Sequence, residues 1–234
     1  MHISEGMLPA GYALAYGVGA AICVGKGIYN YKKESRERPM HKQLTGVFTA
    51  AILIISLLPI PVPMTGSCSH PAGTPLAAIF MGPMMTSFMS AVGLLIHALF
   101  MAHGGLTTLG ANVLTMGVFG GLVGWLLFKG CRKMGLNLFI SGLVAGLIGD
   151  LFVYVGTSIQ LALALHGNTP LLTVFWLIYG AFLPTQIPLA VLEGVFTGLT
   201  LNYIARVRPD ILYNFKIIGR KEYVSLSGGL ANEQ

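Results

Sequence analysis

Charged residues are scarce in this chain of 234 residues. Asp, Glu, Lys and Arg make up 9% of it and hydrophobic residues 54%, whereas a soluble globular domain carries about 25% charged residues. Apolar runs of about 20 residues, each long enough to cross a bilayer as a helix, follow one another along the chain. The composition excludes a soluble domain and predicts an all-α, polytopic membrane bundle.

Several sequence motifs are missing as well. The three cysteines, Cys23, Cys68 and Cys131, lie far apart without a CxxC pair, so neither a disulfide framework nor a cysteine metal site is indicated. There is no GxxxxGK[ST] phosphate loop and no HExxH pair, so we expect no enzyme, and any ATP hydrolysis must reside in another protein. No positive charge precedes the first apolar run, which argues against a cleaved signal peptide.

Seven hydrophobic segments are expected within a single integral membrane domain, 1–234. The last apolar run is too long for one typical span and contains Pro184 and Pro188, so we divide it near Thr185–Gln186. The first five segments and this divided run cover about 8–29, 44–63, 76–102, 113–128, 136–165 and 171–205.

Basic residues orient this bundle. Eleven of the fourteen Lys and Arg flank the first loop or follow the last segment, and the remaining three are Lys129, Arg132 and Lys133. The positive-inside rule then predicts an external N-terminus, a cytoplasmic tail over 206–234, and those three residues on the outside. The basic excess therefore reflects orientation in the cell membrane, and no nucleic-acid partner is expected.

The chain opens with Met1-His2, which can chelate a transition metal. The Met1 amine, the deprotonated His2 backbone nitrogen and the His2 imidazole would close two small chelate rings in one plane. Such a planar nitrogen set suits Ni(II) or Cu(II) and disfavours Zn(II). The segment 1–9 is thus expected to be an external metal-chelating segment, with Glu5 either holding it in place, offsetting charge or simply solvated.

A fourth ligand is expected from the second external loop. His70 is the only imidazole of this turn-rich stretch between the second and third segments, and it lies on the same predicted side as Met1. Ser67, Ser69 and Thr74 are candidates to hydrogen-bond the second ring nitrogen of a ligating histidine.

Three motifs in the same order resemble a known family. They are Met1–Pro9 (MHISEGMLP), His70–Thr74 (HPAGT) and His103–Asn112 (HGGLTTLGAN). The chain is similar to the CbiM/NikM family, the substrate-binding S components of energy-coupling-factor (ECF) nickel and cobalt importers, and is closest to the nickel branch.

The resemblance implies an additional N-terminal helix on a six-helix core, and a metal site formed by Met1, His2 and His70. It also implies Ni(II), or Co(II), as cargo, and an ECF transmembrane coupling protein with ABC ATPase subunits as partners. Whether a small accessory membrane subunit joins them is left open.

Three other polar residues leave alternatives open. His103 is expected near the cytoplasmic end of the third segment, in a turn where it caps carbonyls; a second metal site or a supporting role at the first are the alternatives. Asp150 and Glu193 lie inside predicted spans, where ionisable groups are costly and mark functional sites. A self-sufficient divalent-cation permease or channel using these two carboxylates is the main alternative function.

Overall fold

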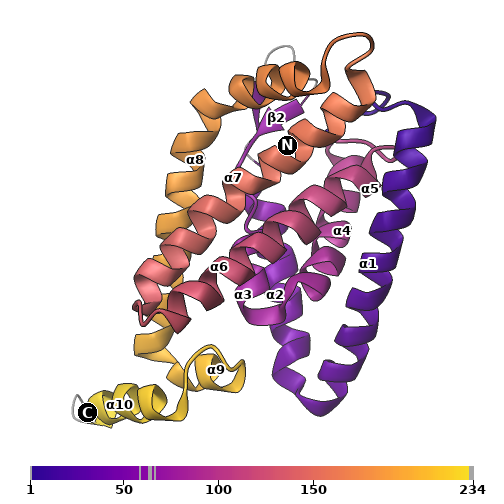
Figure 1. The fold of residues 1–234 in the computed structure, drawn as a ribbon. Helices are drawn as coiled ribbons and strands as arrows, with labels where there is room; N and C mark the ends of the chain where they lie inside the picture. Colours follow the sequence, from indigo (N-terminus) through magenta and orange to yellow (C-terminus); the bar gives the residue numbers. More distant parts are fainter. Residues whose placement is uncertain (1, 58, 63–64, 66, 232–234) are drawn as a thin grey trace.

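The computed structural model describes residues 2–57, 59–62, 65 and 67–231 and is a bundle of long helices (Figure 1). Two short strands pair antiparallel, with Ile60 opposite Ser69 and Val62 opposite Ser67. In chain order the elements are α1 (Ala10–Glu37), α2 (Pro39–Ile55), β1 (Ile60–Val62), β2 (Ser67–Ser69), α3 (Thr74–Met81), α4 (Pro83–Phe100), α5 (Leu109–Asn112), the π-helix η1 (Val113–Gly120), α6 (Gly121–Lys133), α7 (Leu138–Leu165), α8 (Leu171–Val207), α9 (Pro209–Asn214) and α10 (Arg220–Ala231).

The predicted membrane bundle is confirmed. Among the described residues, five helices are long and apolar enough to cross a membrane: α1, α4, the continuous helix 109–133, α7 and α8. Large apolar side chains such as Leu14 and Ile22 of α1 and Leu177 of α8 are about 70% exposed, at 71%, 69% and 68%. Water would not tolerate so many exposed apolar side chains on the outer faces, whereas lipid does.

The third predicted segment was wrong as a single span. The chain breaks at Gly82, whose φ of +78° lies in the left-handed region, and turns back on itself. The short helix α3, 8 residues long, therefore stops part-way along the bundle, and α4 returns to the end from which α3 came (Figure 1). Glycine adopts this backbone conformation without the steric cost that a Cβ would impose.

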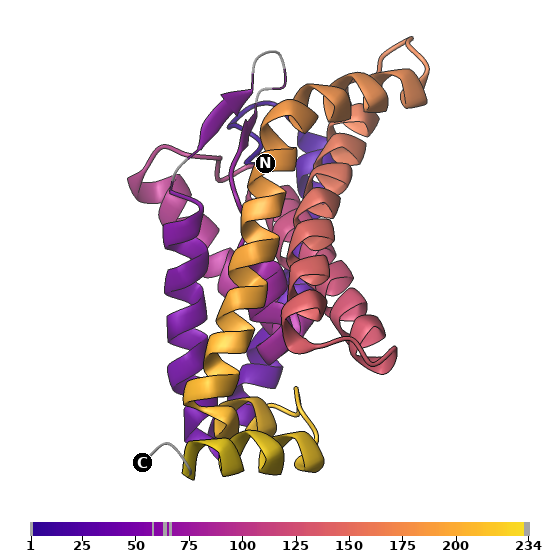
Figure 2. The same ribbon diagram turned by 90° about the vertical axis from the view of Figure 1, so that its left-hand side faces the viewer.

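The division of the last segment was also wrong. Residues 171–207 form one helix, α8, with Pro184 and Pro188 inside it. The helix bends but continues (Figure 2). Proline is tolerated inside membrane helices more readily than in soluble ones. The break in the third segment adds one change of direction, and the undivided last segment removes one. Helix α8 therefore still leads to the end of the bundle opposite the start of α1.

All Lys and Arg side chains lie at or near one end of the bundle, which we call the basic end. This end gathers the last turns of α1, α6 and α8, the start of α2, and α9 and α10 (Figure 1). Lys129, Arg132 and Lys133, expected on the outside, are here too, because the fold-back at Gly82 reverses the direction of the following helix. Arg132 pairs with Glu222 of α10 at 2.5 Å.

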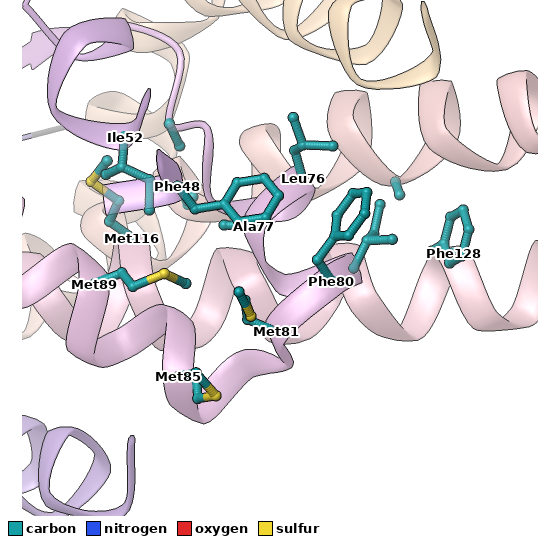
Figure 3. Close-up of a cluster of buried hydrophobic side chains, with 14 of the residues drawn as sticks. Phe48, Ile52, Leu76, Ala77, Phe80, Met81, Met85, Met89, Met116 and Phe128 are labelled. Atoms are coloured by element: carbon teal, nitrogen blue, oxygen red, sulfur yellow. The ribbon is translucent and has the colours of Figure 1, made fainter. Parts of the chain in front are cut away.

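The hydrophobic core is rich in methionine and phenylalanine. Met89 and Met116 are fully buried, and they pack between α3, α4 and the helix 109–133 together with Phe48 and Ile52 of α2 (Figure 3). The flexible thioether fills irregular gaps of this kind. The core therefore holds the short α3 in a defined position part-way along the bundle, with the loop before it directed toward the end opposite the basic end.

Candidate metal centre

The segment before α1 folds back into the bundle. The Ile3 backbone N–H donates to Asn112 Oδ1 at 2.8 Å, and the Ile3 carbonyl accepts from the Thr108 hydroxyl at 2.7 Å. Ile3 is fully buried and His2 is only 2% exposed. Met1 itself, the first of the expected ligands, lies outside the described residues. The bonds at Ile3 deliver the His2 side chain into the interior of the protein.

Two glycines make room for this segment. A Cβ on Gly105 would lie 2.7 Å from Glu5 Cα, and one on Gly104, where φ is +81°, would lie 3.3 Å from His2 Cδ2. The Glu5 carboxylate accepts from the Thr107 backbone N–H at 3.2 Å and from the Thr107 hydroxyl. The hydroxyl bond lowers the pKa of Glu5. Of the roles considered for Glu5, holding the segment in place is the one that the geometry supports.

Asn112 is expected to be essential for presenting His2. Replacing it with Ala removes the acceptor for Ile3 N–H, and we expect metal affinity to fall by about 10–100-fold, as for other groups that orient a ligand. The matched control is Asn137→Ala, because Asn137 caps α7 through a 2.8 Å bond from Ile140 N–H. That variant should lose about 1 kcal/mol of stability and keep its affinity. Equal affinities of the two variants in a metal titration would contradict the assignment.

His70 approaches from the other side and is fully buried. Its backbone N–H donates to the Tyr154 hydroxyl at 2.9 Å, and that hydroxyl donates to the His70 carbonyl at 3.0 Å. The Glu193 carboxylate accepts from the backbone N–H groups of Ala72, at 2.5 Å, and Gly73, at 2.9 Å. Helices α7 and α8 thereby clamp the loop that carries His70.

The two imidazoles of His2 and His70 face one another. His70 Nδ1 lies 2.8 Å from the Pro71 carbonyl, which can only accept, so Nδ1 carries the proton and Nε2 presents a lone pair. That Nε2 lies 2.7 Å from His2 Nδ1. Burial lowers the pKa of both imidazoles below the ordinary value of 6.5. Neutral imidazoles are the form that binds metal.

The expected supporting hydroxyls have other surroundings. The Pro71 carbonyl bonds the second ring nitrogen of His70, the role proposed for Ser67, Ser69 and Thr74. Ser69 instead bonds the Thr185 hydroxyl at 2.8 Å. Within the described residues, the buried Ser67 and Thr74 hydroxyls have no hydrogen-bond partner. The backbone of the loop therefore provides the hydrogen bond to the second ring nitrogen of His70.

Two further side chains complete the centre, His103 and Cys68. One donor atom from each of His2, Cys68, His70 and His103 lies within 4.8 Å of the others. His103 Nε2 is 3.3 Å from Cys68 Sγ. The expected placement of His103 at the cytoplasmic end was wrong, because α4 runs back to the amino-terminal end. Only the His103 backbone N–H bonds a carbonyl, that of His97, at 3.3 Å; its ring faces His2 at 4.3 Å between centroids.

Cys68 was missed by the sequence analysis. Burial opposes ionisation of its thiol, but the positive charge of the amino terminus, and then hydrogen bonds to the imidazoles of His103, His2 and His70, hold its pKa well below its usual range. One sequence signal was available: residues two apart on an extended strand share a face, so Cys68 in β2 and His70 just after it are both directed into the centre.

A buried cluster of side chains that could hold a metal ion agrees with the family to which the sequence is similar. Residues 2–211 match the family model described as "CbiM: Cobalt uptake substrate-specific transmembrane region". The chain belongs to the CbiM family. Membership and the apolar helices together make it a membrane protein of a family named for cobalt uptake.

Relatives with curated names agree with the CbiM family assignment. The chain is 41% identical to "Cobalt transport protein CbiM" of Sorangium cellulosum, covering 93% of this chain and 97% of that protein. It is 44% identical to the protein of the same name from Geobacter sulfurreducens over 93% of this chain, but spans only 63% of that longer relative. These names specify cobalt, transport and no enzyme activity; the nickel branch stays a prediction.

Solved structures show the same fold. The chain superposes on "Crystal Structure of an Truncated Transition metal Transporter" with a TM-score of 0.76 and 26% identity, covering 87% of this chain and 98% of that one. A second structure, "Crystal Structure of an transition metal transporter", gives 0.78 at 24% identity and covers 94% and 100% of the two chains.

Asp150 and Glu193 are both buried in this CbiM-family bundle, at 0% and 3% exposure. Asp150 Oδ2 accepts from the Gln186 side-chain amide, while Glu193 holds the His70 loop. The cavity of about 200 Å³ next to Glu193 is lined mostly by apolar side chains, and Asp150 does not line it. The geometry makes Glu193 a positioning residue for His70.

Glu193→Gln is expected to weaken metal binding by about 10–100-fold. The amide keeps the size of the side chain, but one of its ends is a donor that cannot accept from Ala72 or Gly73 N–H, so the loop loses an anchor. Glu222→Gln, which loses only the ion pair with Arg132 at the basic end, is the matched control and should bind metal normally. A metal titration with an unchanged affinity for Glu193→Gln would refute this role.

Proposed function

We propose that this chain is the substrate-binding subunit of an ECF-type importer and captures Ni(II), or Co(II), in an all-nitrogen site. The four donors are the Met1 amine, the His2 backbone nitrogen, His2 Nδ1 and His70 Nε2. The observation that carries the proposal is the 2.7 Å separation of the two imidazole nitrogens inside a buried centre.

This separation suits neighbouring ligands of a planar ion. Metal–imidazole bonds of about 2.0–2.1 Å at right angles place two nitrogens about 2.9 Å apart. A tetrahedral ion would spread the same nitrogens to about 3.3 Å. Among the described hydrogen bonds none uses the His2 backbone N–H, so this nitrogen could lose its proton to a metal without breaking another contact.

Cys68 and His103 belong to an alternative set of metal ligands. With His2 and His70 they form a side-chain set of three nitrogens and one sulfur, which suits tetrahedral Zn(II) or Co(II) better than planar Ni(II). The test is the spectrum of the purified protein with one equivalent of Ni(II). The all-nitrogen site is expected to be yellow and diamagnetic, and unchanged in Cys68→Ser; a thiolate-to-metal band that disappears in Cys68→Ser would reject it.

Energy for transport is expected from partners. No phosphate loop is present in the sequence, so a transmembrane coupling protein and ABC ATPases would drive delivery. The gathering of all Lys and Arg at the basic end supports a cytoplasmic location for that end. The metal centre then faces the outside, where a nutrient metal arrives.

The self-sufficient permease remains a weaker second candidate. It requires Asp150 and Glu193 to line a cation path, but the Glu193 oxygens are occupied by backbone N–H groups of the His70 loop. Transport of cobalt or nickel by this chain alone in ATPase-free vesicles would favour the permease and contradict the importer.

Metal affinity should fall steeply with decreasing pH. When the metal binds, the His2 backbone amide releases one proton at any pH. The Met1 amine releases another at pH values below its pKa of about 7.7–8.0. Because burial lowers the pKa of His2 and His70, the imidazoles add no further proton near neutrality. We therefore expect about a 100-fold loss per pH unit between pH 7.5 and 6.5.

The same titration separates the two donor sets. A site made only of the four side chains would release almost no proton near neutrality, since the pKa of the Cys68 thiol is already depressed. Isothermal titration at several pH values measures the slope. A nearly flat affinity between pH 6.5 and 7.5 would exclude the amine and amide as ligands.

A further inference from the structure

The short α3 leaves a cavity of about 790 Å³ at the basic end of the bundle. The helix stops at Met81, and the chain turns back at Gly82, so the space below this turn is not filled by helix. Walls come instead from α1, α6 and the segment after α9. Phe80, Met81, Met85 and Phe128, which form one end of the hydrophobic core, line its apolar side (Figure 3).

The polar side of this cavity is strongly basic. It is lined by one carboxylate, Glu34, and by six cationic side chains: Lys26, Lys33, Arg38, Lys129, Arg132 and Lys216. Glu34 lies 3.7 Å from His41, and Arg132 is paired with Glu222. Lys33 and Lys216 have no hydrogen-bond or ion-pair partner for their ammonium groups within the described residues. Several positive charges thus converge without enough negative charge to balance them.

Lys216 is held at this cavity by a strained backbone. Its φ of +58° is unusual for a residue other than glycine and costs energy. The preceding Phe215 fixes the segment, because its ring stacks on His41 at 4.4 Å and meets Phe80 at 6.0 Å. The loop after α9 is therefore ordered against the cavity, where its lysine adds to the charge.

Two helices form opposite walls of the cavity. Helix α1 packs on α4 and α5, and α6 packs on α3 and α7. Toward the basic end α1 and α6 run apart (Figure 1). Both contribute cations to opposite walls, Lys26 and Lys33 from α1 and Lys129 from α6. A ligand with an anionic head and apolar chains could place its head between these cations and its chains against the apolar wall.

We propose that this cavity binds the phosphate headgroup of an anionic phospholipid, with the acyl chains leaving between α1 and α6. Basic pockets between membrane helices at the cytoplasmic face recognise such headgroups. The combination of unpaired lysines with an apolar wall favours a lipid over a soluble anion, which would need no apolar contact. The site is separate from the metal centre, which lies at the opposite end of the bundle.

Native mass spectrometry tests the assignment on the full-length protein in mild detergent. Phosphatidylglycerol is titrated against phosphatidylcholine with the same chains. The cavity variant combines Lys33→Gln, Lys129→Gln and Lys216→Gln. The control combines Lys32→Gln, Lys133→Gln and Lys221→Gln, which remove as many charges from the same end outside the cavity. Thermal melting confirms that both variants are folded.

The wild-type and control proteins should retain one phosphatidylglycerol each, and the cavity variant should bind it at least about ten-fold more weakly. Phosphatidylcholine should bind weakly to all three proteins. Equal phosphatidylglycerol binding by the two variants would overturn the site. Displacement of the lipid by millimolar inorganic phosphate would show a soluble-anion site instead. Loss of association with the coupling subunit while lipid binding persists would identify a protein-docking surface.

Discussion

A Gly-Ser extension before Met1 is expected to lower the affinity for Ni(II) by more than about 100-fold, which exceeds the loss of a group that merely supports a ligand. The extension converts the primary amine into an amide and removes the start of the chelate. His2 is buried at 2% exposure in a segment held by Ile3 and Glu5, so the added residues have no room to follow the same path. Metal content and titration of the purified protein measure the effect.

The same dipeptide added after Gln234 is the control for this variant and should leave binding unchanged, because α10, the last described helix, lies at the basic end, away from the metal centre. The Cys68→Ser protein is a second comparison. Nickel binding that survives the amino-terminal extension and is lost in Cys68→Ser would assign the metal to the four side chains rather than to the terminal chelate.

His70→Ala is expected to reduce metal affinity by a similar factor, more than about 100-fold. The substitution removes Nε2, the nitrogen 2.7 Å from His2 Nδ1. The loop itself should stay in place, since its contacts to Tyr154 and Glu193 are made by backbone atoms. The loss is therefore expected in metal titrations while the far-ultraviolet circular dichroism spectrum is unchanged.

Free imidazole sharpens this experiment. In His70→Ala it can occupy the vacated space and replace the missing nitrogen, so millimolar imidazole should restore part of the binding. His166→Ala, which removes an imidazole between α7 and α8, is the matched control; it should bind metal normally and show no response to imidazole. Normal affinity of His70→Ala would remove His70 from the ligand set.

The centre depends on contacts between three parts of the chain. His2 enters with the segment anchored by Asn112, His70 with the loop clamped by Glu193, and His103 with the turn after α4. The first two of these segments are anchored by residues far from them in sequence, Asn112 and Glu193. Pre-organisation of this kind keeps the donor atoms close before an ion arrives, so less of the binding energy is used in ordering them.

The sequence by itself was enough to predict that the chain lies in a membrane and that its fold is all-α. It also pointed to His2 and His70 as candidate residues of the centre. These signals are local or compositional: few charges, long apolar runs, an amino-terminal Met-His pair and a lone histidine in a turn-rich loop. In lipid the backbone polar groups must bond one another, and a helix does so within a single segment. An apolar composition is therefore enough to predict an all-α membrane protein. The clustering of Lys and Arg also predicts an external N-terminus and a cytoplasmic C-terminus, and this orientation stays a prediction.

Only the tertiary structure decided how the helices run and which side chains meet. In the sequence, Gly82 is one glycine among many in an apolar run. Its left-handed turn reverses the direction of α4 and brings His103 to His2, and this turn depends on the packing of the bundle. Pro184 and Pro188 suggest a break in the sequence, but the helix continues through both of them, as membrane helices tolerate. Cys68 joins the centre through His103, 35 positions away, and His2 meets His70 across 68. Contacts over such separations leave no local pattern, since they arise from folding the whole bundle.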